Sequence, residues 1–469
     1  MDAAYDLVVI GAGSAGLVAA PFAGAVGAKV LLVEKDRIGG DCTWTGCVPS
    51  KALIHTAGIV HSMRDAAGLT GGGSAPTPDA GRIMERVRAA IDGVYAFETA
   101  EALAQQGVEV AFGAAHFIDD DTISIGDRRV SSRPFVVCTG AEPIVPSISG
   151  LAQTPFLTYK DAFSLRAIPH RLLVLGSGPI GAELAQAFGR LGAAVVLVEA
   201  ADRILPMADP EAGAVLRERF TREGVEVVVQ APVERVEKTA GGVALTAAGR
   251  RIDGDALLVA VGRRPRLDGL NLERAGVAVS EDGISVDSKL RTSNPRIYAA
   301  GDAAGSLQFT HYAGWQGYVA ARNALFPGAM RGKREGVPWV VFTDPEVGQV
   351  GLTEDEAHKR GWRIEVLRLP LDRVDRAQTT GEVDGFIKLV TRDDTVVGAT
   401  VVAPVAGEVI NELALAIRSK ATLRQLSSTI HAYPTYGIGI QQLASHATIA
   451  EFTRGWQGRL LRRLAKRST

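Results

Sequence analysis

Asp6-Leu-Val-Val-Ile10-Gly11-Ala12-Gly13-Ser14-Ala15-Gly16 joins a short apolar run to three glycines near the start of the chain. The pattern predicts a β-strand, a tight turn and a helix of small residues, although this helix carries Pro21 in its interior. A second apolar run, residues 29–33, ends at Glu34, 23 residues after Gly11. This spacing is typical of a βαβ unit that binds a dinucleotide, with the pyrophosphate on the helix N-terminus and the carboxylate on a ribose.

The same pattern occurs a second time in the chain. An apolar run at 171–175 leads into Gly176, Gly178 and Gly181, and the next apolar run ends at Glu199, again 23 residues after the first glycine. Each glycine motif alone is a weak indication, whereas two of them at identical spacing are much more specific. The sequence therefore predicts two dinucleotides bound side by side.

Composition and charge exclude several classes of protein. The chain has 469 residues, 46% hydrophobic and 22% charged, and its formal net charge of -1 gives no general attraction to nucleic acid or anionic membranes. The acidic start does not resemble a signal peptide, and we find no apolar stretch long enough to cross a bilayer. Three cysteines in so long a chain do not make a secreted disulfide framework, so we expect a soluble cytoplasmic protein.

Two of these cysteines form a candidate redox pair. They lie in Gly39-Gly-Asp-Cys42-Thr-Trp-Thr-Gly-Cys47-Val-Pro-Ser-Lys51, where the glycine between them allows a distorted turn. We expect a helix to begin near Pro49, and its N-terminal dipole to favour thiolate. Cys138 lies among apolar residues and is predicted to be buried in a strand.

With this motif the chain resembles the class I pyridine nucleotide–disulfide oxidoreductases, the family of dihydrolipoyl dehydrogenase, glutathione reductase and mercuric reductase. The resemblance extends over nearly the whole chain, apart from a Gly- and Pro-rich loop at 68–78. Further matching motifs are Thr139-Gly140, Val261-Gly262-Arg263-Arg264-Pro265, the segment that ends at Asp302, Val341 to Glu346, and Gly398 to Glu408. The family implies FAD, a nicotinamide dinucleotide and a homodimer.

The resemblance also implies a role for each catalytic residue. Cys47 corresponds to the sulfur next to the flavin and Cys42 to the interchange sulfur that meets the acceptor. Lys51 could reach the N5 edge of the flavin, with Glu183 as its partner, because a buried lysine needs a carboxylate. Electrons would pass from NADH through FAD to the Cys42–Cys47 disulfide and then to an acceptor.

The cofactor-binding residues follow from the same motifs. Glu34 is expected on the adenosine ribose of FAD and Asp302 on its ribityl chain. Glu199 would bind both hydroxyls of an unphosphorylated ribose, which favours NADH, while the nearby Arg203 keeps NADPH as the alternative. The full predicted set is Gly11, Gly13, Gly16, Glu34, Lys51, Thr139, Gly140, Gly176, Gly178, Gly181, Glu199, Gly262 and Asp302, with no metal site.

The predicted fold is α/β, with two Rossmann-like dinucleotide-binding domains, for FAD and NAD(P), and a C-terminal α+β dimerisation domain. We place the FAD domain at 1–150 and 265–335, the NAD(P) domain at 151–264 and the interface domain at 336–455. Residues 83–106 are predicted to form one amphipathic helix without a chemical role. Residues 456–469 form a basic tail that packs on protein or frays, or that contacts anionic lipid.

The chain departs from the family near its C-terminus. Members that act on small dithiols carry a His-Pro pair followed closely by glutamate, and this dyad manages the thiol proton. Here Tyr433 stands at the histidine position and Ile438 at the glutamate position. Tyrosine is a poor base at neutral pH but can donate a proton or a hydrogen bond, and His431 is the alternative acid.

This departure favours an acceptor that needs little proton transfer, such as a thiophilic metal ion like Hg(II), a quinone or a similar oxidant. Mercuric reductases also lack the histidine, but they carry a second, C-terminal cysteine pair, and no cysteine follows Cys138 here. A dihydrolipoyl dehydrogenase with a substitute acid is the first alternative. A redox-sensing flavoprotein with little turnover is an alternative of another class.

Overall fold

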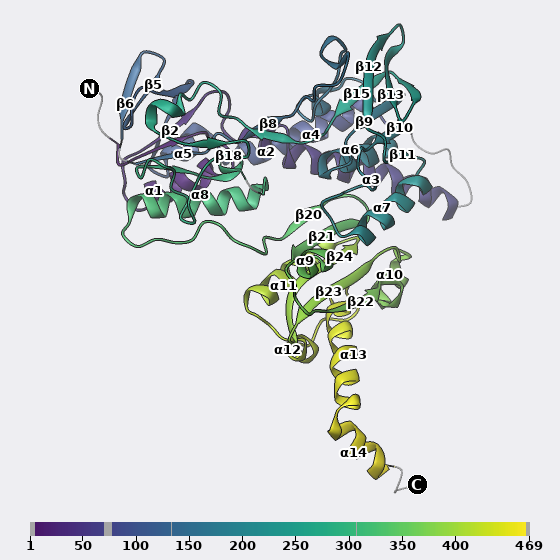
Figure 1. Cartoon of the computed structure of the whole chain (residues 1–469). Helices are drawn as coiled ribbons and strands as arrows, with labels where there is room; N and C mark the ends of the chain where they lie inside the picture. Colours follow the sequence, from purple (N-terminus) through teal and green to yellow (C-terminus); the bar gives the residue numbers. More distant parts are fainter. Residues whose placement is uncertain (1–4, 70–76, 133, 306, 466–469) are drawn as a thin grey trace. The chain divides into compact units, whose positions relative to one another are not determined.

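A computed structural model of the protein describes residues 5–69, 77–132, 134–305 and 307–465. The contacts divide the chain into two compact units: residues 1–200 with 224–334, and residues 201–223 with 335–469. Figure 1 shows both units and labels many of their elements. The 68–78 loop lies mostly outside the described residues.

The first unit is built on two parallel sheets, as the two glycine motifs predict. The first sheet has the order β19-β7-β1-β2-β3, with every neighbouring pair parallel. Its strands are β1 (Leu7–Ile10), β2 (Val30–Glu34), β3 (Val108–Phe112), β7 (Phe135–Val137) and β19 (Ile297–Ala299). Helix α1 (Gly16–Ala25), which contains Pro21, packs against α8 (Thr310–Leu325). Strands β1, β2, β7 and β19 are buried along their whole length, which explains their apolar runs, whereas the edge strand β3 is partly exposed.

The second parallel sheet has the order β11-β10-β9-β15. Its strands are β9 (Arg171–Leu175), β10 (Ala194–Val198), β11 (Glu226–Val228) and β15 (Ala256–Val259), and α6 (Pro179–Arg190) connects β9 to β10. Small antiparallel sheets complete the unit. They comprise β4 (Ala115–Phe117), β5 (Thr122–Ile125) and β6 (Arg128–Ser131); β12 (Val233–Thr239), β13 (Gly242–Ala247) and β14 (Arg250–Gly254); β8 (Ala141–Pro143) with β16 (Arg263–Pro265); and β17 (Val279–Ser280) with β18 (Gly283–Ile284).

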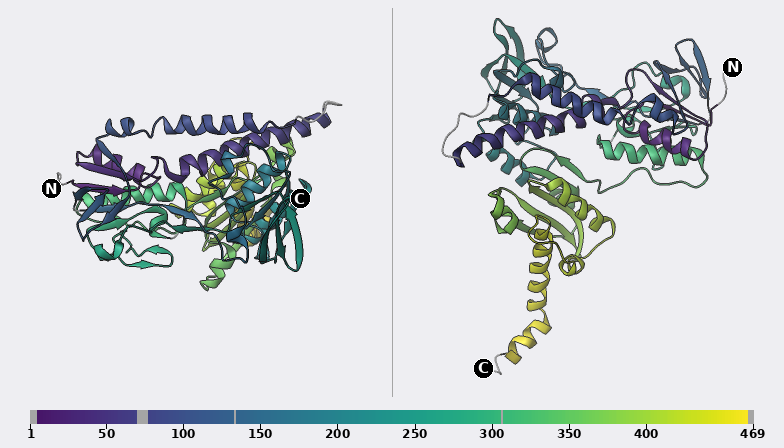
Figure 2. Two further views of the ribbon diagram at one scale, coloured as in Figure 1. Left: turned by 90° about the horizontal axis from the view of Figure 1, so that it is seen from above. Right: turned by 180° about the vertical axis from the view of Figure 1, so that it is seen from behind.

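Helices between these two sheets carry the cysteines. Cys42 lies within the short α2 (Gly40–Trp44), and α3 (Cys47–Leu69) begins at Cys47, two residues earlier than the expected start near Pro49. The long α3 and α4 (Ala80–Tyr95) lie side by side (Figure 2). The single helix predicted over 83–106 is wrong, because α4 ends at Tyr95 and α5 (Ala100–Ala104) starts anew, with Thr99 as its cap. A side-chain cap stabilises this new start and explains the break.

The second unit is an α+β domain around one antiparallel sheet of order β20-β21-β24-β23-β22. Its strands are β20 (Trp339–Val341), β21 (Glu346–Gly351), β22 (Glu365–Pro370), β23 (Phe386–Arg392) and β24 (Thr395–Ala403). Its helices are α7 (Pro210–Arg222), α9 (Glu354–Lys359), α10 (Asp375–Thr380), α11 (Ala406–Arg418), α12 (Leu423–Ser428), α13 (Ile438–Arg454) and α14 (Trp456–Ala465). None of the described helices is long and apolar enough to cross a membrane.

Candidate active site

The two cysteines of the predicted redox pair are brought together at the adjoining ends of α2 and α3. Both are free thiols, so the structure corresponds to the reduced pair. A side chain at Gly46 would place its Cβ 2.7 Å from the Asp41 carbonyl oxygen, which explains why glycine stands between the cysteines. Cys47 is exposed and its Sγ lies 3.2 Å from Thr310 Oγ1 at the start of α8. Thr310 is 263 residues away in sequence, and no motif indicated its presence here.

The two thiols differ strongly in acidity. The hydrogen bond from Cys42 and the charge of Lys51 together lower the pKa of Cys47 to about 6, against the partial desolvation of its thiol. The same interaction with Cys47, together with burial, raises the pKa of Cys42 well above its ordinary value. The reduced pair therefore holds one proton on Cys42 and leaves Cys47 as the thiolate at neutral pH.

Lys51 reaches the carboxylate that the motif comparison indicates. Its Nζ lies 2.8 Å from Glu183 Oε2, which joins α3 to α6. The Glu183 side chain is 6% exposed and the Lys51 side chain 34% exposed, so the carboxylate is the more buried partner. This arrangement fixes a cationic group one helical turn from Cys47.

The two glycine turns have the shape that a dinucleotide needs. The first glycines, Gly11 and Gly176, have φ of 103° and 98°, where other residues are strained. A Cβ on Gly16 or Gly181 would lie 1.9 Å from a carbonyl oxygen of the turn, so these positions allow close packing of helix and strand. By contrast, a Cβ at Gly178 would meet nothing within 4 Å. The second glycine of this turn therefore faces open space, where a pyrophosphate can approach the backbone.

The acids at the strand ends hold these turns. Glu34 Oε2 accepts a hydrogen bond from the Ala12 amide at 2.8 Å. Glu199 Oε2 accepts bonds from the Ser177 amide and hydroxyl, at 2.8 and 2.7 Å. Both carboxylates are thus fixed beside their glycine turns, at the carboxyl ends of parallel strands.

A further part of the predicted cofactor site shows unpaired buried groups. Thr139 Oγ1 is buried and lacks a hydrogen-bond partner among the described residues, as does Arg263 Nε. The other end of the Arg263 guanidinium lies 2.8 Å from Asp302 Oδ2. Tyr159, which sequence reasoning missed, donates a hydrogen bond to Asp41 at 2.6 Å close by. Buried polar atoms without partners are rare, so these groups fit a polar ligand.

A pocket of 520 Å³ opens on the Cys42 side of the pair. It is formed by α1, the start of α2, the turn after α4 and the first turns of α8. Its lining residues are Ser14, Leu17, Val18, Gly39, Cys42, Thr43, Glu98, Thr310, His311, Gly314, Trp315 and Tyr318. The pocket leaves Cys42 accessible to a small molecule.

The residues at the departure from the family lie in the second unit. Tyr433 is 67% exposed and donates a hydrogen bond to Asp375 Oδ2 at 3.0 Å, which raises the tyrosine pKa further. His431 lies with Nδ1 2.9 Å from the Thr429 carbonyl oxygen and Nε2 2.8 Å from Glu412 Oε1. Because both ring nitrogens face acceptors, His431 is held in place by both bonds when it is protonated.

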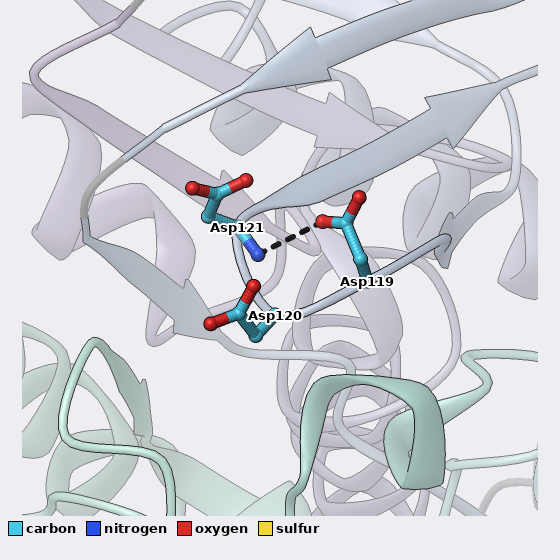
Figure 3. Close-up of side chains that lie close together, drawn as sticks. All are labelled: Asp119, Asp120 and Asp121. Atoms are coloured by element: carbon cyan, nitrogen blue, oxygen red, sulfur yellow. Dashed lines mark hydrogen bonds between the residues drawn. The ribbon is translucent and has the colours of Figure 1, made fainter.

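Three consecutive aspartates, Asp119 to Asp121, gather in the turn between β4 and β5 (Figure 3). The Asp121 amide donates to Asp119 Oδ1 at 3.1 Å, and Arg296 pairs with Asp120 at 3.3 Å. The turn geometry and this arginine account for the cluster, so it does not by itself indicate a metal site.

Comparison with known proteins identifies the family. Residues 5–317 match the pyridine nucleotide-disulphide oxidoreductase family, and residues 337–444 match the dimerisation domain of that family. The chain belongs to this family of oxidoreductases, which use FAD and a pyridine nucleotide, and the predicted α/β architecture is confirmed.

Named relatives divide between two activities. A dihydrolipoyl dehydrogenase of Thermus scotoductus is 39% identical, over 94% of this chain and 96% of that protein. A mercuric reductase of Staphylococcus aureus is 35% identical, over 94% of this chain and 82% of that protein. Among solved structures, the HOCl-induced flavoprotein disulfide reductase RclA of Escherichia coli, in a Cu(II) complex, matches with a TM-score of 0.85 and 28% identity, covering 94% of this chain and 99% of RclA.

Proposed function

We propose that the protein is an NADH-dependent flavoenzyme whose Cys42–Cys47 pair delivers electrons to an acceptor other than a standard small disulfide. A soft metal ion such as Hg(II) or a quinone fits this description best. The observation that carries the proposal is at Tyr433, where the expected histidine is replaced by an exposed tyrosine that donates to Asp375. An enzyme that turns over small dithiol substrates rapidly needs a general base at this position.

The residues present fit FAD. Gly11, Gly13 and Gly16 would hold its pyrophosphate, Glu34 its adenosine ribose, and Asp302 its ribityl chain. Thr139 and Gly140 lie beside this region, and the unpaired Thr139 hydroxyl supports a ligand there. When bound, FAD takes hydride from the nicotinamide and passes an electron pair to the disulfide.

The nicotinamide dinucleotide is assigned to the second turn, Gly176 to Gly181, with Gly262 nearby. Glu199 carries the preference for NADH, because its carboxylate accepts from ribose hydroxyls and repels a 2′-phosphate. The hydrogen bonds from Ser177 support this role, since they hold the carboxylate at the end of β10.

The chain's own groups manage charge and protons at the dithiol. Cys47 stays a thiolate next to the flavin position, and Lys51 stabilises negative charge there through a position fixed by Glu183. Cys42 keeps the proton and faces the acceptor pocket. Tyr433 is assigned as a hydrogen-bond donor to the acceptor rather than as a base.

The proposed domain division follows the sheets. The first parallel sheet belongs to an FAD domain, 1–150 and 265–335, and the second to an NAD(P) domain, 151–264. Residues 336–455 form the interface domain of a homodimer, which the match to the family dimerisation domain supports. Residues 456–469 follow as a basic tail.

An anaerobic titration with NADH tests the electron path. The wild type is expected to develop a long-wavelength thiolate-to-flavin band after two electrons, and Cys47→Ser is expected to lack it. Bleaching of the flavin without this band in the wild type would contradict the disulfide relay. The rate at which the reduced enzyme is reoxidised is then compared among four acceptors: Hg(II), Cu(II), quinones and lipoamide.

A dihydrolipoyl dehydrogenase with a substitute acid is the second candidate. The 39% identity to the Thermus scotoductus enzyme over nearly both full lengths favours it. This candidate predicts fast NAD-linked turnover with dihydrolipoamide, whereas our first proposal predicts slow turnover with this substrate. The alternative of another class, a redox-sensing flavoprotein, would turn over slowly with every acceptor and would bind partners according to its redox state.

A further inference from the structure

The turn between α4 and α5 carries a carboxylate into the acceptor pocket. The chain leaves helix α4 at Tyr95, and the Glu98 amide donates to the Tyr95 carbonyl oxygen at 2.8 Å. The Thr99 hydroxyl accepts from the Ala102 amide at 3.2 Å and starts α5. A continuous helix would not contain this turn. The break therefore presents Glu98 to the same pocket that Cys42 lines.

Contacts with α2 hold the carboxylate in a defined position. Thr43 Oγ1 donates to Glu98 Oε2 at 2.8 Å, and Thr43 directly follows Cys42 in the chain. Gly39 has a φ of 106°, and a Cβ there would lie 2.7 Å from the same oxygen and 2.8 Å from Thr43 Cβ, so a side chain at this position would be strained and would press on this contact. Among the described residues, Thr43 supplies the one side-chain hydrogen bond to this carboxylate. Glu98 Oε1 is left for a group in the pocket.

The chemistry of the pair requires a base on this side. The thiolate is the nucleophile and the metal ligand, yet the reduced pair keeps its proton on Cys42. An acceptor that enters the pocket therefore meets a thiol, which must lose its proton before it attacks or binds. The dyad that serves this purpose elsewhere is replaced here by Tyr433 and Ile438.

We propose that Glu98 is the base that takes the proton from Cys42 when an acceptor enters the pocket. The inference rests on the proposed function. The proton moves from Cys42 Sγ to Glu98 Oε1, directly or through one water molecule, and the electron pair of the S–H bond stays on sulfur. Glu98 then releases the proton to solvent or to the reduced acceptor through the open pocket.

The environment of Glu98 suits a proton acceptor. Its partial burial raises the pKa of the carboxyl above its ordinary value, although the hydrogen bond from Thr43 opposes this shift. A general base is most effective when its pKa lies near the working pH. The other titratable groups that line the pocket are Cys42 on α2 and His311 and Tyr318 on α8. His311 is therefore the competing base, and the experiment must separate the two.

The test uses the reduced holoenzyme and 5,5′-dithiobis(2-nitrobenzoate) in stopped flow. Attack by the Cys42 thiolate releases one thionitrobenzoate, and attack by Cys47 on the mixed disulfide releases a second and re-forms the protein disulfide. The released thiolate needs no proton, so the rate reports proton removal from Cys42. Glu98→Gln is expected to slow this reaction by roughly 10²-fold near neutral pH, and Glu98→Asp to restore part of the rate.

The pH profile separates a chemical from a structural role. In the wild type the rate should fall as pH drops through the raised Glu98 pKa, because only the carboxylate accepts a proton. In Glu98→Gln this acidic limb of the pH–rate profile should vanish, and the rate should rise only at high pH, as Cys42 itself ionises. Glu101→Gln, three residues along on the exposed side of α5, is the matched control and should behave as wild type.

Two outcomes overturn the inference. One is an unchanged profile in Glu98→Gln, and the other is a limb that disappears only in His311→Gln. The reduction of each variant by NADH, followed by its charge-transfer band, is measured first. Absence of that band in the wild type defeats the proposed function, whereas a normal band with an unaltered Glu98→Gln profile defeats the Glu98 inference alone.

Discussion

Lys51 Nζ lies 2.8 Å from Glu183 Oε2, although the two residues are 132 positions apart in the chain. Lys51 belongs to the helix that begins at Cys47, and Glu183 to the helix that follows the second glycine turn. The contact therefore ties α3, which begins at Cys47, to α6. Because Glu183 is almost fully buried, it fixes the position of Lys51 one helical turn from Cys47.

Glu183→Gln should weaken this link without removing the side-chain oxygen. Loss of a charge-assisted hydrogen bond lets Lys51 move, so we expect reduction by NADH to slow about tenfold in stopped flow. The free energy of unfolding should fall by only about 1 kcal/mol, since Lys51 is one-third exposed and solvent screens the pair. Lys51→Arg, which keeps the charge, serves as the comparison. A reduction rate in Glu183→Gln equal to that of the wild type would show that the pair is only structural.

The thiolate of Cys47 should govern the pH range of the reduced enzyme. Its pKa is lowered to about 6, so the thiolate is present above this pH and is lost as the pH falls through it. The charge-transfer band of the NADH-reduced enzyme should therefore disappear between about pH 7 and pH 5, with half of it lost near pH 6. Cys42→Ser should keep a band, because Cys47 remains. A band that titrates near pH 9 would contradict the assignment.

Glu199 should decide between the two nicotinamide dinucleotides. Its carboxylate is fixed by Ser177, and a 2′-phosphate would meet a like charge there. Glu199→Ala should raise the ratio of kcat/KM for NADPH to that for NADH by at least about tenfold, mainly through the loss of NADH binding. Glu234→Ala, an exposed change in the same predicted domain, should leave the ratio unaltered. Wild-type preference for NADPH would overturn the role given to Glu199.

Most of the fold could be predicted because its signals are local. The glycine turns at Gly11 and Gly176 fix a strand, a turn and a helix within about 25 residues, and the central parallel strands β1, β9 and β10 contain continuous apolar runs. The cysteine motif likewise indicated the dithiol, although the helix starts at Cys47 rather than near Pro49.

The missed features depend on contacts that are distant in sequence or on a single cap. Amphipathic periodicity runs through residues 83–106 and predicts one helix, but it does not reveal that the chain turns at Glu98. The Thr99 cap was readable in principle, since threonine favours a helix start. Thr310 contacts Cys47 and Tyr159 contacts Asp41, although each pair is more than a hundred residues apart in sequence. No local sequence pattern could therefore predict these contacts.

Tyr433→His should move the enzyme toward small dithiols. Histidine with a pKa near neutrality exchanges protons at working pH, which tyrosine does not. We expect turnover with dihydrolipoamide and NAD to rise about tenfold, less than the ~10²–10⁴ of a complete acid–base pair, because Ile438 cannot orient the new imidazole. Tyr433→Phe is the matched control and should lose roughly 2- to 10-fold with the native acceptor, the worth of one neutral hydrogen bond. If Tyr433→Phe instead abolished turnover with dihydrolipoamide that the wild type performs rapidly, the tyrosine would be the substitute acid of a dihydrolipoyl dehydrogenase, and the metal-ion or quinone assignment would fail.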